Sequence, residues 1–112
     1  MDAHERFTLL WTATQPVVGS YIGSLVTDFQ EAEDLLQEVA LVLLRKFHEY
    51  DVSRPFVARA LGVARFEILH ARRQHARSFV AAQSELLENV TAAYTELAPE
   101  LDRRASDASS LS

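Results

Sequence analysis

Apolar residues recur along most of the chain at the three- and four-residue spacing of an α-helix, and no stretch alternates as a half-buried strand would. The first helical stretch runs from about residue 3 to 26. Pro16 interrupts it, and because proline lacks a backbone N–H and clashes with the preceding turn, we expect a kink or break there. The second stretch begins after Asp28, which can cap a helix and form a capping-box-like pair with Glu31. We expect this helix to bury one apolar face and to end near residues 48–50.

The third predicted helix spans about residues 54–78, where Ser53 is a good N-cap and Pro55 is tolerated in the first turn. A fourth helix begins near Ser84 and is expected to weaken at Pro99. Together these patterns predict an all-α fold, a compact bundle of three to four helices. With 112 residues, of which 48% are apolar, the chain has the length of one domain and enough apolar side chains for a core.

The composition argues against several classes of protein. There is no cysteine, which excludes a disulfide framework and a thiolate zinc site. No apolar run approaches the roughly 18–20 residues needed to cross a bilayer, and the first residues do not resemble a signal peptide, so we expect a cytoplasmic protein. The four histidines show no metal-binding spacing, and no glycine-rich phosphate loop or nucleophile elbow is present. We therefore expect no enzyme activity, no cofactor and no bound metal.

Charge is distributed unevenly along the chain. The net charge is −5, which taken alone argues against a nucleic-acid ligand. Residues 1–51 carry nine acids and three bases, and residues 81–112 carry six acids and two bases. Between them, residues 52–80 carry six arginines and only one acid, Glu67. One basic segment between two acidic ones creates a local field that could hold a polyanion.

The third predicted helix concentrates its basic residues on one narrow stripe, opposite its apolar face. The stripe consists of Arg59, Phe66, His70, Arg73 and Arg77; the apolar face consists of Val57, Leu61, Ala64, Ile68 and Ala71, flanked by Arg65 and Arg72. Cations can bind phosphates and an aromatic ring can stack on a base, so this stripe favours binding to single-stranded or melted nucleic acid. The alternative is an ordinary solvated helix face that happens to carry one phenylalanine.

Two blocks of this sequence resemble a known family. Residues 32–39 read AEDLLQEV and resemble the AEDLLQE signature of region 2.2 in sigma-70-type transcription initiation factors, of which the extracytoplasmic-function group is most similar. Residues 50–56 and 63–69, followed by Arg72 and Arg73, resemble regions 2.3 and 2.4. The run ARFEIL followed by arginines resembles a subgroup described from planctomycetes and related bacteria. The resemblance covers about residues 7–78, and both blocks occur in the order and at the separation of that family.

The resemblance implies a division of the chain. Residues 1–80 correspond to a sigma region 2 domain, and residues 81–112 to the start of a linker with one further helix and a frayed C-terminal end. Complete factors of this group also carry a region 4 helix-turn-helix that reads the −35 element. Residues 79–112 show no such pattern, so we expect a single domain of a longer factor rather than a natural truncation.

The resemblance also implies a surface for RNA polymerase. In such factors the region 2.2 helix docks on the clamp-helix coiled coil of the polymerase β′ subunit. Here that role transfers to Asp34, Gln37 and Glu38, with Leu41 and Arg45 alongside. The spacing of Asp34, Glu38, Leu41 and Arg45 places them on one helix face, distinct from the buried stripe. A polar face with one exposed leucine suits a protein interface, although an ordinary solvated face would look the same.

Promoter DNA is the second implied partner. Regions 2.3 and 2.4 recognise and melt the −10 element and hold a flipped non-template base in a pocket under the loop before the third helix. That loop maps to Glu49, Tyr50, Asp51, Val52, Ser53 and Arg54, and the strand contacts map to Arg59, Phe66, His70, Arg73 and Arg77, with Arg65 and Arg72 beside them. An anti-sigma protein is a further implied partner.

Arg59 is the main departure from the family pattern. Many members carry tryptophan at this position, which affects how a melted base would be captured here. Others carry asparagine at the position of Phe66 and aspartate at that of His70.

A different function also has to be weighed: a helical interaction or dimerisation module without DNA binding explains the acidic flanks and the apolar content. It does not explain the arginine stripe opposite the core.

Overall fold

The computed structural model describes residues 1–73 and 84–110, with side chains described for 1–73 and 85–104. Within these residues the protein is all-helical, as the apolar spacing predicts, and contains no β-strand. None of the described helices is long and apolar enough to cross a membrane. The elements are α1 (Ala3–Leu25), α2 (Phe29–Arg45), the short 3-10 helix η1 (Phe47–Glu49), α3 (Phe56–Arg72) and α4 (Ser84–Ser110).

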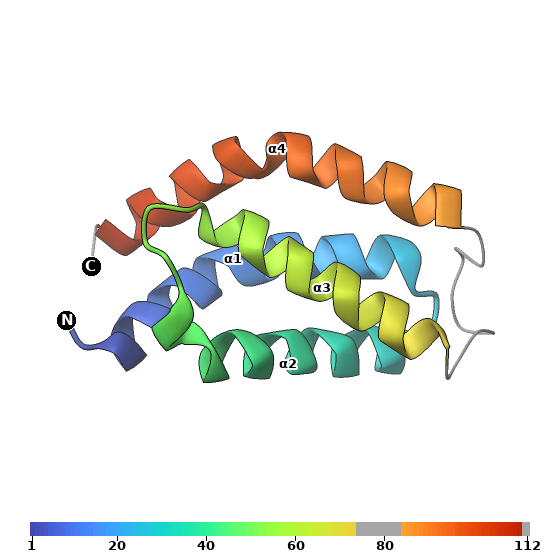
Figure 1. Ribbon diagram of the computed structural model, residues 1–112, viewed down its shortest axis with the longest axis horizontal. Coiled ribbons are helices and arrows are strands. Elements are labelled where there is room, and N and C mark those ends of the chain that lie inside the picture. Colours follow the sequence, from blue (N-terminus) through green and yellow to red (C-terminus); the bar gives the residue numbers. More distant parts are fainter. Residues whose placement is uncertain (74–83, 111–112) are drawn as a thin grey trace.

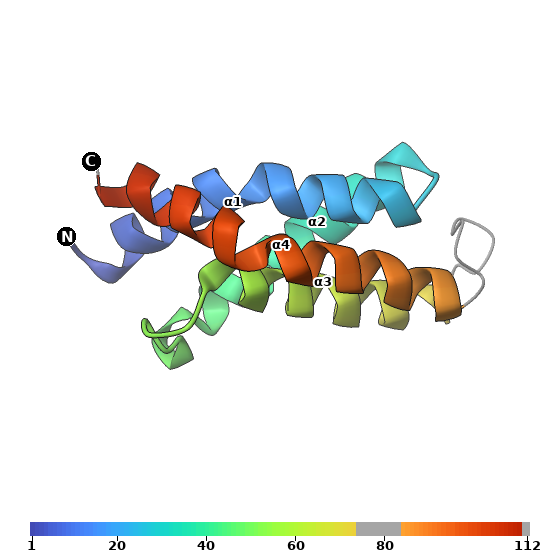
Figure 2. The ribbon, with the colours of Figure 1, turned by 90° about the horizontal axis from the view of Figure 1, so that it is seen from above.

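The four long helices form a bundle, which confirms the predicted fold class. α1 and α3 pack against each other, with α2 on one side of this pair and α4 on the other (Figure 1). Figure 2 shows α4 running over the boundary between α1 and α3. The loop between η1 and α3 lies at the same end of the bundle as the start of α1 and the end of α4 (Figure 1).

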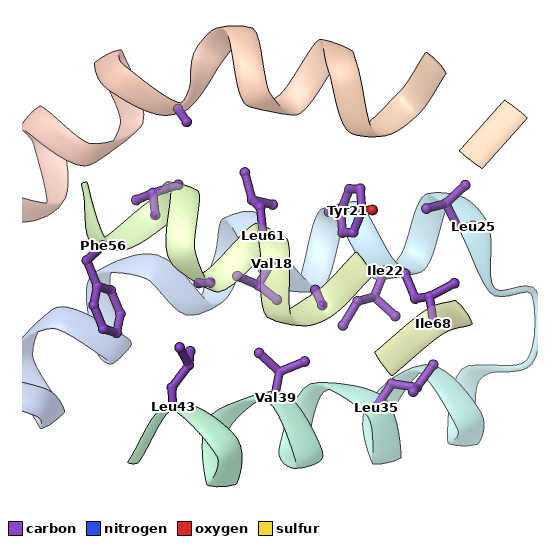
Figure 3. Packing of buried hydrophobic residues seen from close by; sticks show 14 of the residues in the cluster. Val18, Tyr21, Ile22, Leu25, Leu35, Val39, Leu43, Phe56, Leu61 and Ile68 are labelled. Carbon is purple, nitrogen blue, oxygen red and sulfur yellow. The ribbon is translucent and has the colours of Figure 1, made fainter. Parts of the chain in front are cut away.

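The core is built mainly from one apolar face each of α1, α2 and α3, to which α4 adds buried side chains. Figure 3 shows these side chains converging between the ribbons, and all those it labels are at most 9% exposed. The predicted core face of α3 is confirmed at Val57, Leu61, Ala64 and Ile68, whereas Ala71 is only half-buried. Because this face is committed to the core, the opposite side of α3 is left toward solvent.

The start of α2 is capped as the sequence predicts. The Asp28 carboxylate accepts a hydrogen bond of 2.9 Å from the Glu31 N–H, which satisfies one of the orphan donors at the helix start. Asp2 does the same for Glu5 at the start of α1, at 2.8 Å. α2 ends at Arg45, and η1 continues the helical turn to Glu49, close to the predicted end.

Neither interior proline ends its helix, so the break expected as one outcome at Pro16 does not occur, and α4 does not stop at Pro99. The kink expected as the other outcome at Pro16 stays a prediction. α1 continues through Pro16 to Leu25 because Thr14 and Val18, on either side of the proline, are fully buried. α4 continues through Pro99 because Ala98 is 1% exposed and Asp102 accepts from the backbone N–H of Val57 at 3.2 Å. A proline costs a helix about 3 kcal/mol, and these tertiary contacts outweigh that penalty.

The start of α3 also differs from the prediction. Ser53 does not cap the helix: α3 begins three residues later, at Phe56, and the Ser53 N–H and hydroxyl both donate to the carboxylate of Asp51. Pro55 instead precedes the first helical residue, Phe56, and provides no side-chain cap. The helix is described as far as Arg72, and the predicted extension to residue 78 lies outside the described residues.

α4 packs on the groove between α1 and α3. Its Leu87 and Ala98 are each 1% exposed and belong to the common hydrophobic core. The Tyr21 hydroxyl of α1 lies 2.6 Å from Thr91 Oγ1, and burial raises the pKa of Tyr21, so the phenol stays neutral and keeps this hydrogen bond. The structure therefore places the fourth predicted helix against α1 and α3, although the division of the chain at residue 80 stays a prediction.

Candidate nucleic-acid interface

The stripe on α3 is a solvent-facing surface. Phe66 is 65% exposed, which is unusual for so large an apolar side chain, while His70 and Arg73 are exposed and Arg59 is half-buried. The rings of Phe66 and His70 are parallel within 2°, with centroids 6.5 Å apart. Four of the five predicted stripe residues are thus together on one face, and the fifth, Arg77, lies outside the described residues.

The two flanking arginines sit at the edge of the buried face. Arg65 is committed to α4: its Nη2 lies 2.8 Å and its Nε 2.9 Å from Glu88 Oε1. Arg72 is half-buried near the end of α3. Arg65 therefore forms an ion pair between α3 and α4, whereas the side chain of Arg73 is exposed.

The loop before α3 is held by its own hydrogen bonds. Asp51 Oδ1 accepts from the Ser53 N–H at 2.9 Å and from the Ser53 hydroxyl at 2.7 Å, and the Arg54 N–H donates to the Asp51 carbonyl at 2.9 Å. These two bonds from Ser53 stabilise the carboxylate and lower the pKa of Asp51 below its usual value. The Tyr50 hydroxyl closes the turn by donating to the Arg54 carbonyl at 2.5 Å. The loop is therefore held in its conformation by hydrogen bonds among its own residues.

A cluster of aromatic rings supports the loop from beneath. Tyr50 stacks on Phe47, with centroids 5.7 Å apart, and meets Phe56 edge-on at 5.4 Å. Phe7 of α1 packs edge-on against both phenylalanines, at 5.5 and 6.3 Å. Burial in this cluster raises the pKa of Tyr50, with the nearby Asp102 carboxylate acting in the same direction. Such ring pairs each add about 0.5–1.5 kcal/mol beyond their buried area, so the cluster anchors the loop to the bundle.

An open hollow of about 560 Å³ lies between this loop and the first turns of α3, which we call the loop hollow. It is lined by Glu49, Tyr50, Asp51, Arg54, Pro55, Ala58 and Arg59. Four of the six predicted loop residues therefore line it. Val52 and Ser53 do not, and Val52 is instead 60% exposed.

A second hollow, of about 530 Å³, lies between α2 and α3, and we call it the α2–α3 hollow. Its apolar lining comes from Val42, Gly62, Val63 and Phe66, and its charged lining from Arg45, Lys46, Arg59 and Glu67. Arg59 lines both hollows, and its Nη2 reaches the Lys46 carbonyl at 3.5 Å, the long limit of a hydrogen bond. Lys46, Gly62 and Val63 were not among the predicted site residues; only Lys46 carried a visible signal, as a cation next to Arg45.

The outer face of α2 carries the residues predicted to contact polymerase. Asp34 and Gln37 are exposed, and Leu41 is 42% exposed. Glu38 lies 4.0 Å from Arg45, an exposed pair that contributes at most about 1 kcal/mol. Asp34 accepts from the Gln30 side-chain amide at 3.0 Å. The face is polar with one leucine, while Val39 and Leu43 on its reverse are buried.

Comparison with known proteins identifies the family of this chain. The family model for sigma-70 region 2 matches residues 10–78, more than half of the chain. The chain belongs to the sigma-70 region 2 family. Searches among curated proteins and among solved structures found no significant match.

Membership sets the general role of this sigma-70 region 2 domain. Such domains act in transcription initiation, with RNA polymerase core and promoter DNA as their partners. The match begins at Leu10 within α1 and includes α2, η1, the loop and α3, so it contains both hollows and the outer face of α2. α4 lies beyond the matched segment.

Proposed function

We propose that this sigma-70 region 2 domain docks on the β′ clamp helices of RNA polymerase through α2 and holds the melted −10 non-template strand against α3. The observation that carries the proposal is the loop hollow, which is pre-formed, of suitable volume, and bordered by the exposed stripe of α3. We further propose that the factor is of the extracytoplasmic-function type, related to the planctomycete subgroup, works in the cytoplasm, and is controlled by an anti-sigma protein.

The loop hollow suits a flipped base for physical reasons. Extracting a base from the stack costs a few kcal/mol of free energy, which contacts in the pocket have to offset. The Tyr50 ring and Pro55 supply apolar surface, and Arg54 and Arg59 supply cations for the adjoining phosphates. Because hydrogen bonds and the aromatic cluster already order the loop, binding does not have to spend free energy on ordering it.

The stripe of α3 suits the strand that follows this base. Phe66 offers a ring face on which a base can stack, a contact that contributes about 1–3 kcal/mol in single-strand complexes. Arg73 stands on the same face, where it can neutralise a phosphate. Because the opposite face of α3 is buried, the face that carries both side chains is turned toward solvent.

The proposal is tested by fluorescence anisotropy with a single-stranded −10-like oligonucleotide at low salt, with the domain alone and bound to core polymerase. Phe66→Ala is expected to weaken binding at least fivefold, because the stacking surface is lost. Arg73→Ala is expected to lower the slope of log Kd against log salt concentration by about one, because one phosphate contact is lost.

Two matched variants serve as controls. Phe29→Ala removes an equally exposed phenylalanine, 76% exposed at the start of α2, and Arg104→Ala removes an exposed arginine of α4. Both should bind like the unaltered protein. If Phe66→Ala and Arg73→Ala bind as tightly as these controls in both settings, the stripe does not contact the strand, and an interaction module without DNA binding becomes the better account.

A further inference from the structure

The N-terminal end of α3 has no cap from its own neighbouring residues. The first backbone N–H groups of a helix have no partner inside it, and the side chain just before the helix commonly accepts from one of them. Here Pro55 holds that position and offers no acceptor, while Ser53 donates to Asp51 in the preceding turn. A side-chain cap for this end therefore has to come from a more distant residue.

α4 supplies that cap. Asp102 Oδ1 accepts a hydrogen bond of 3.2 Å from the backbone N–H of Val57, the second residue of α3, across 45 residues of sequence. Figure 1 shows the last turns of α4 beside the start of α3. Asp102 is held there because Ala98, one turn earlier, is buried and Leu101 packs against the core. A carboxylate at this place also meets the positive end of the helix dipole of α3.

The same carboxylate lies behind the loop hollow. Burial raises the pKa of Tyr50, and the charge of Asp102 raises it further, which reflects the proximity of the two groups. The Tyr50 hydroxyl stays protonated and donates to the Arg54 carbonyl, and both residues line the loop hollow together with Pro55 and Ala58. Asp102 thus stands where the two walls of this hollow meet, the loop on one side and the first turn of α3 on the other.

We propose that Asp102 is a positioning residue for base capture: by capping α3 from α4, it fixes the first turn of α3 against the loop and sets the shape of the loop hollow. Asp102 lines neither hollow and acts through the Val57 N–H. This inference rests on the proposed function, because it requires a base in the loop hollow. It gives a role to α4, which lies outside the segment that the family model matches.

The test measures what the removal of one base costs in affinity. Single-stranded −10-like oligonucleotides carry an abasic site at one position at a time, and Kd is measured by anisotropy with the domain bound to core polymerase. At the captured position, the unaltered protein should bind the abasic strand about fivefold more weakly than the complete strand. In Asp102→Ala the two strands should bind alike, because the walls of the hollow are no longer fixed against each other.

Two further substitutions of Asp102 separate the hydrogen bond from the charge. Asp102→Asn keeps an oxygen acceptor without the charge, and asparagine caps helices as well as aspartate does, so the abasic penalty should remain. Asp102→Glu keeps the charge but carries the acceptor one methylene further out, so the penalty should shrink. This variant also stands in for Asp102→Ala if thermal unfolding shows that the alanine variant is not folded.

Asp2→Ala is the matched control for a loss of stability. The Asp2 carboxylate accepts from the Glu5 N–H at 2.8 Å and caps α1, whose start lies at the same end of the bundle as the loop (Figure 1). No residue of α1 lines either hollow. The variant loses an equivalent cap, so its thermal unfolding should shift by a similar amount while the abasic penalty stays.

The outcomes separate this inference from the proposed function. If Asp102→Ala keeps the full penalty, or if Asp102→Asn loses it as completely as Asp102→Ala, the cap does not position the hollow while the proposed function stands. An equal loss in Asp2→Ala means that stability alone is affected, and it overturns the inference as well. If the unaltered protein shows no penalty at any position, the proposed function fails, and the inference fails with it.

Discussion

Asp51 illustrates how one carboxylate shapes the site. Two hydrogen bonds from Ser53 stabilise its charged form, and the pKa of Asp51 is lowered below its usual value as a result. A carboxyl whose pKa is lowered in the folded protein contributes stability above its ordinary pKa, and that contribution is lost as the pH falls through the folded value. At neutral pH the turn therefore has this full contribution, and it should loosen as the pH falls through the lowered pKa of Asp51.

Removing the Ser53 hydroxyl tests this account of the turn. In Ser53→Ala the pKa of Asp51 should rise toward its usual value, because one of the two donors to the carboxylate is lost while the backbone N–H remains. An NMR titration of the Asp51 carboxyl carbon measures the change. Ser24→Ala removes a hydroxyl that bonds instead to the Tyr21 carbonyl, and it should leave the titration as it was. An unchanged Asp51 titration in Ser53→Ala would contradict the account.

Single residues differ in how far the sequence reveals their place. The exposure of Phe66 followed from helical period alone, since Arg59 and Phe66 lie opposite a continuous apolar face. The ion-pair partner of Arg65 could not be predicted from helical period, because Glu88 is 23 residues away and its position depends on how α4 docks. The open space around Gly62 was equally hidden, since it depends on how the rest of the bundle packs around α3.

At the scale of elements, α2 presents two faces with different tasks. Its inner face contributes Leu35, Val39 and Leu43 to the core, which fixes the direction of the outer face. The outer face carries Asp34 and Glu38, neither of which is buried. Charge changes on this face should therefore alter binding without unfolding the domain.

Charge reversal on α2 is the test of polymerase docking. Asp34→Lys and Glu38→Lys should each reduce capture by a β′ clamp-helix fragment at least tenfold, because each change puts a positive charge where the proposed partner would contact a negative one. Glu96→Lys makes the same charge change on an exposed position of α4 and should not affect capture. Capture that remains at the unaltered level in both α2 variants would remove this helix from the interface.

Helix types and caps could be predicted, but helix interruptions could not. The Asp28 cap and the buried stripe of α2 depend on residues close in sequence, and both are confirmed. The effects of Pro16 and Pro99 depend on contacts with other helices, which a local pattern does not contain. The cap expected at Ser53 was wrong because the helix begins only at Phe56, after a turn in which Ser53 donates to Asp51.

For the whole molecule, α4 is the feature that the family match does not cover. It buries Leu87 against the bundle and ties itself to α3 through Glu88 and Asp102. Together with the acidic N-terminal half, it accounts for the net charge of −5, while Arg59 and Arg73 lie on the solvent-facing stripe. An overall acidic molecule thus presents a local basic surface where the strand is proposed to bind.

The central claim, that the domain holds a melted −10 base while on polymerase, is tested most directly by base fluorescence. A fork-junction promoter fragment carries 2-aminopurine at the captured position and is bound by core polymerase with the domain. We expect fluorescence to rise when the base leaves the stack, and the rise to disappear in Ala58→Leu, which fills the loop hollow but leaves the outer face of α2 intact. No rise with the unaltered protein, or an equal rise with Ala58→Leu, would contradict the claim.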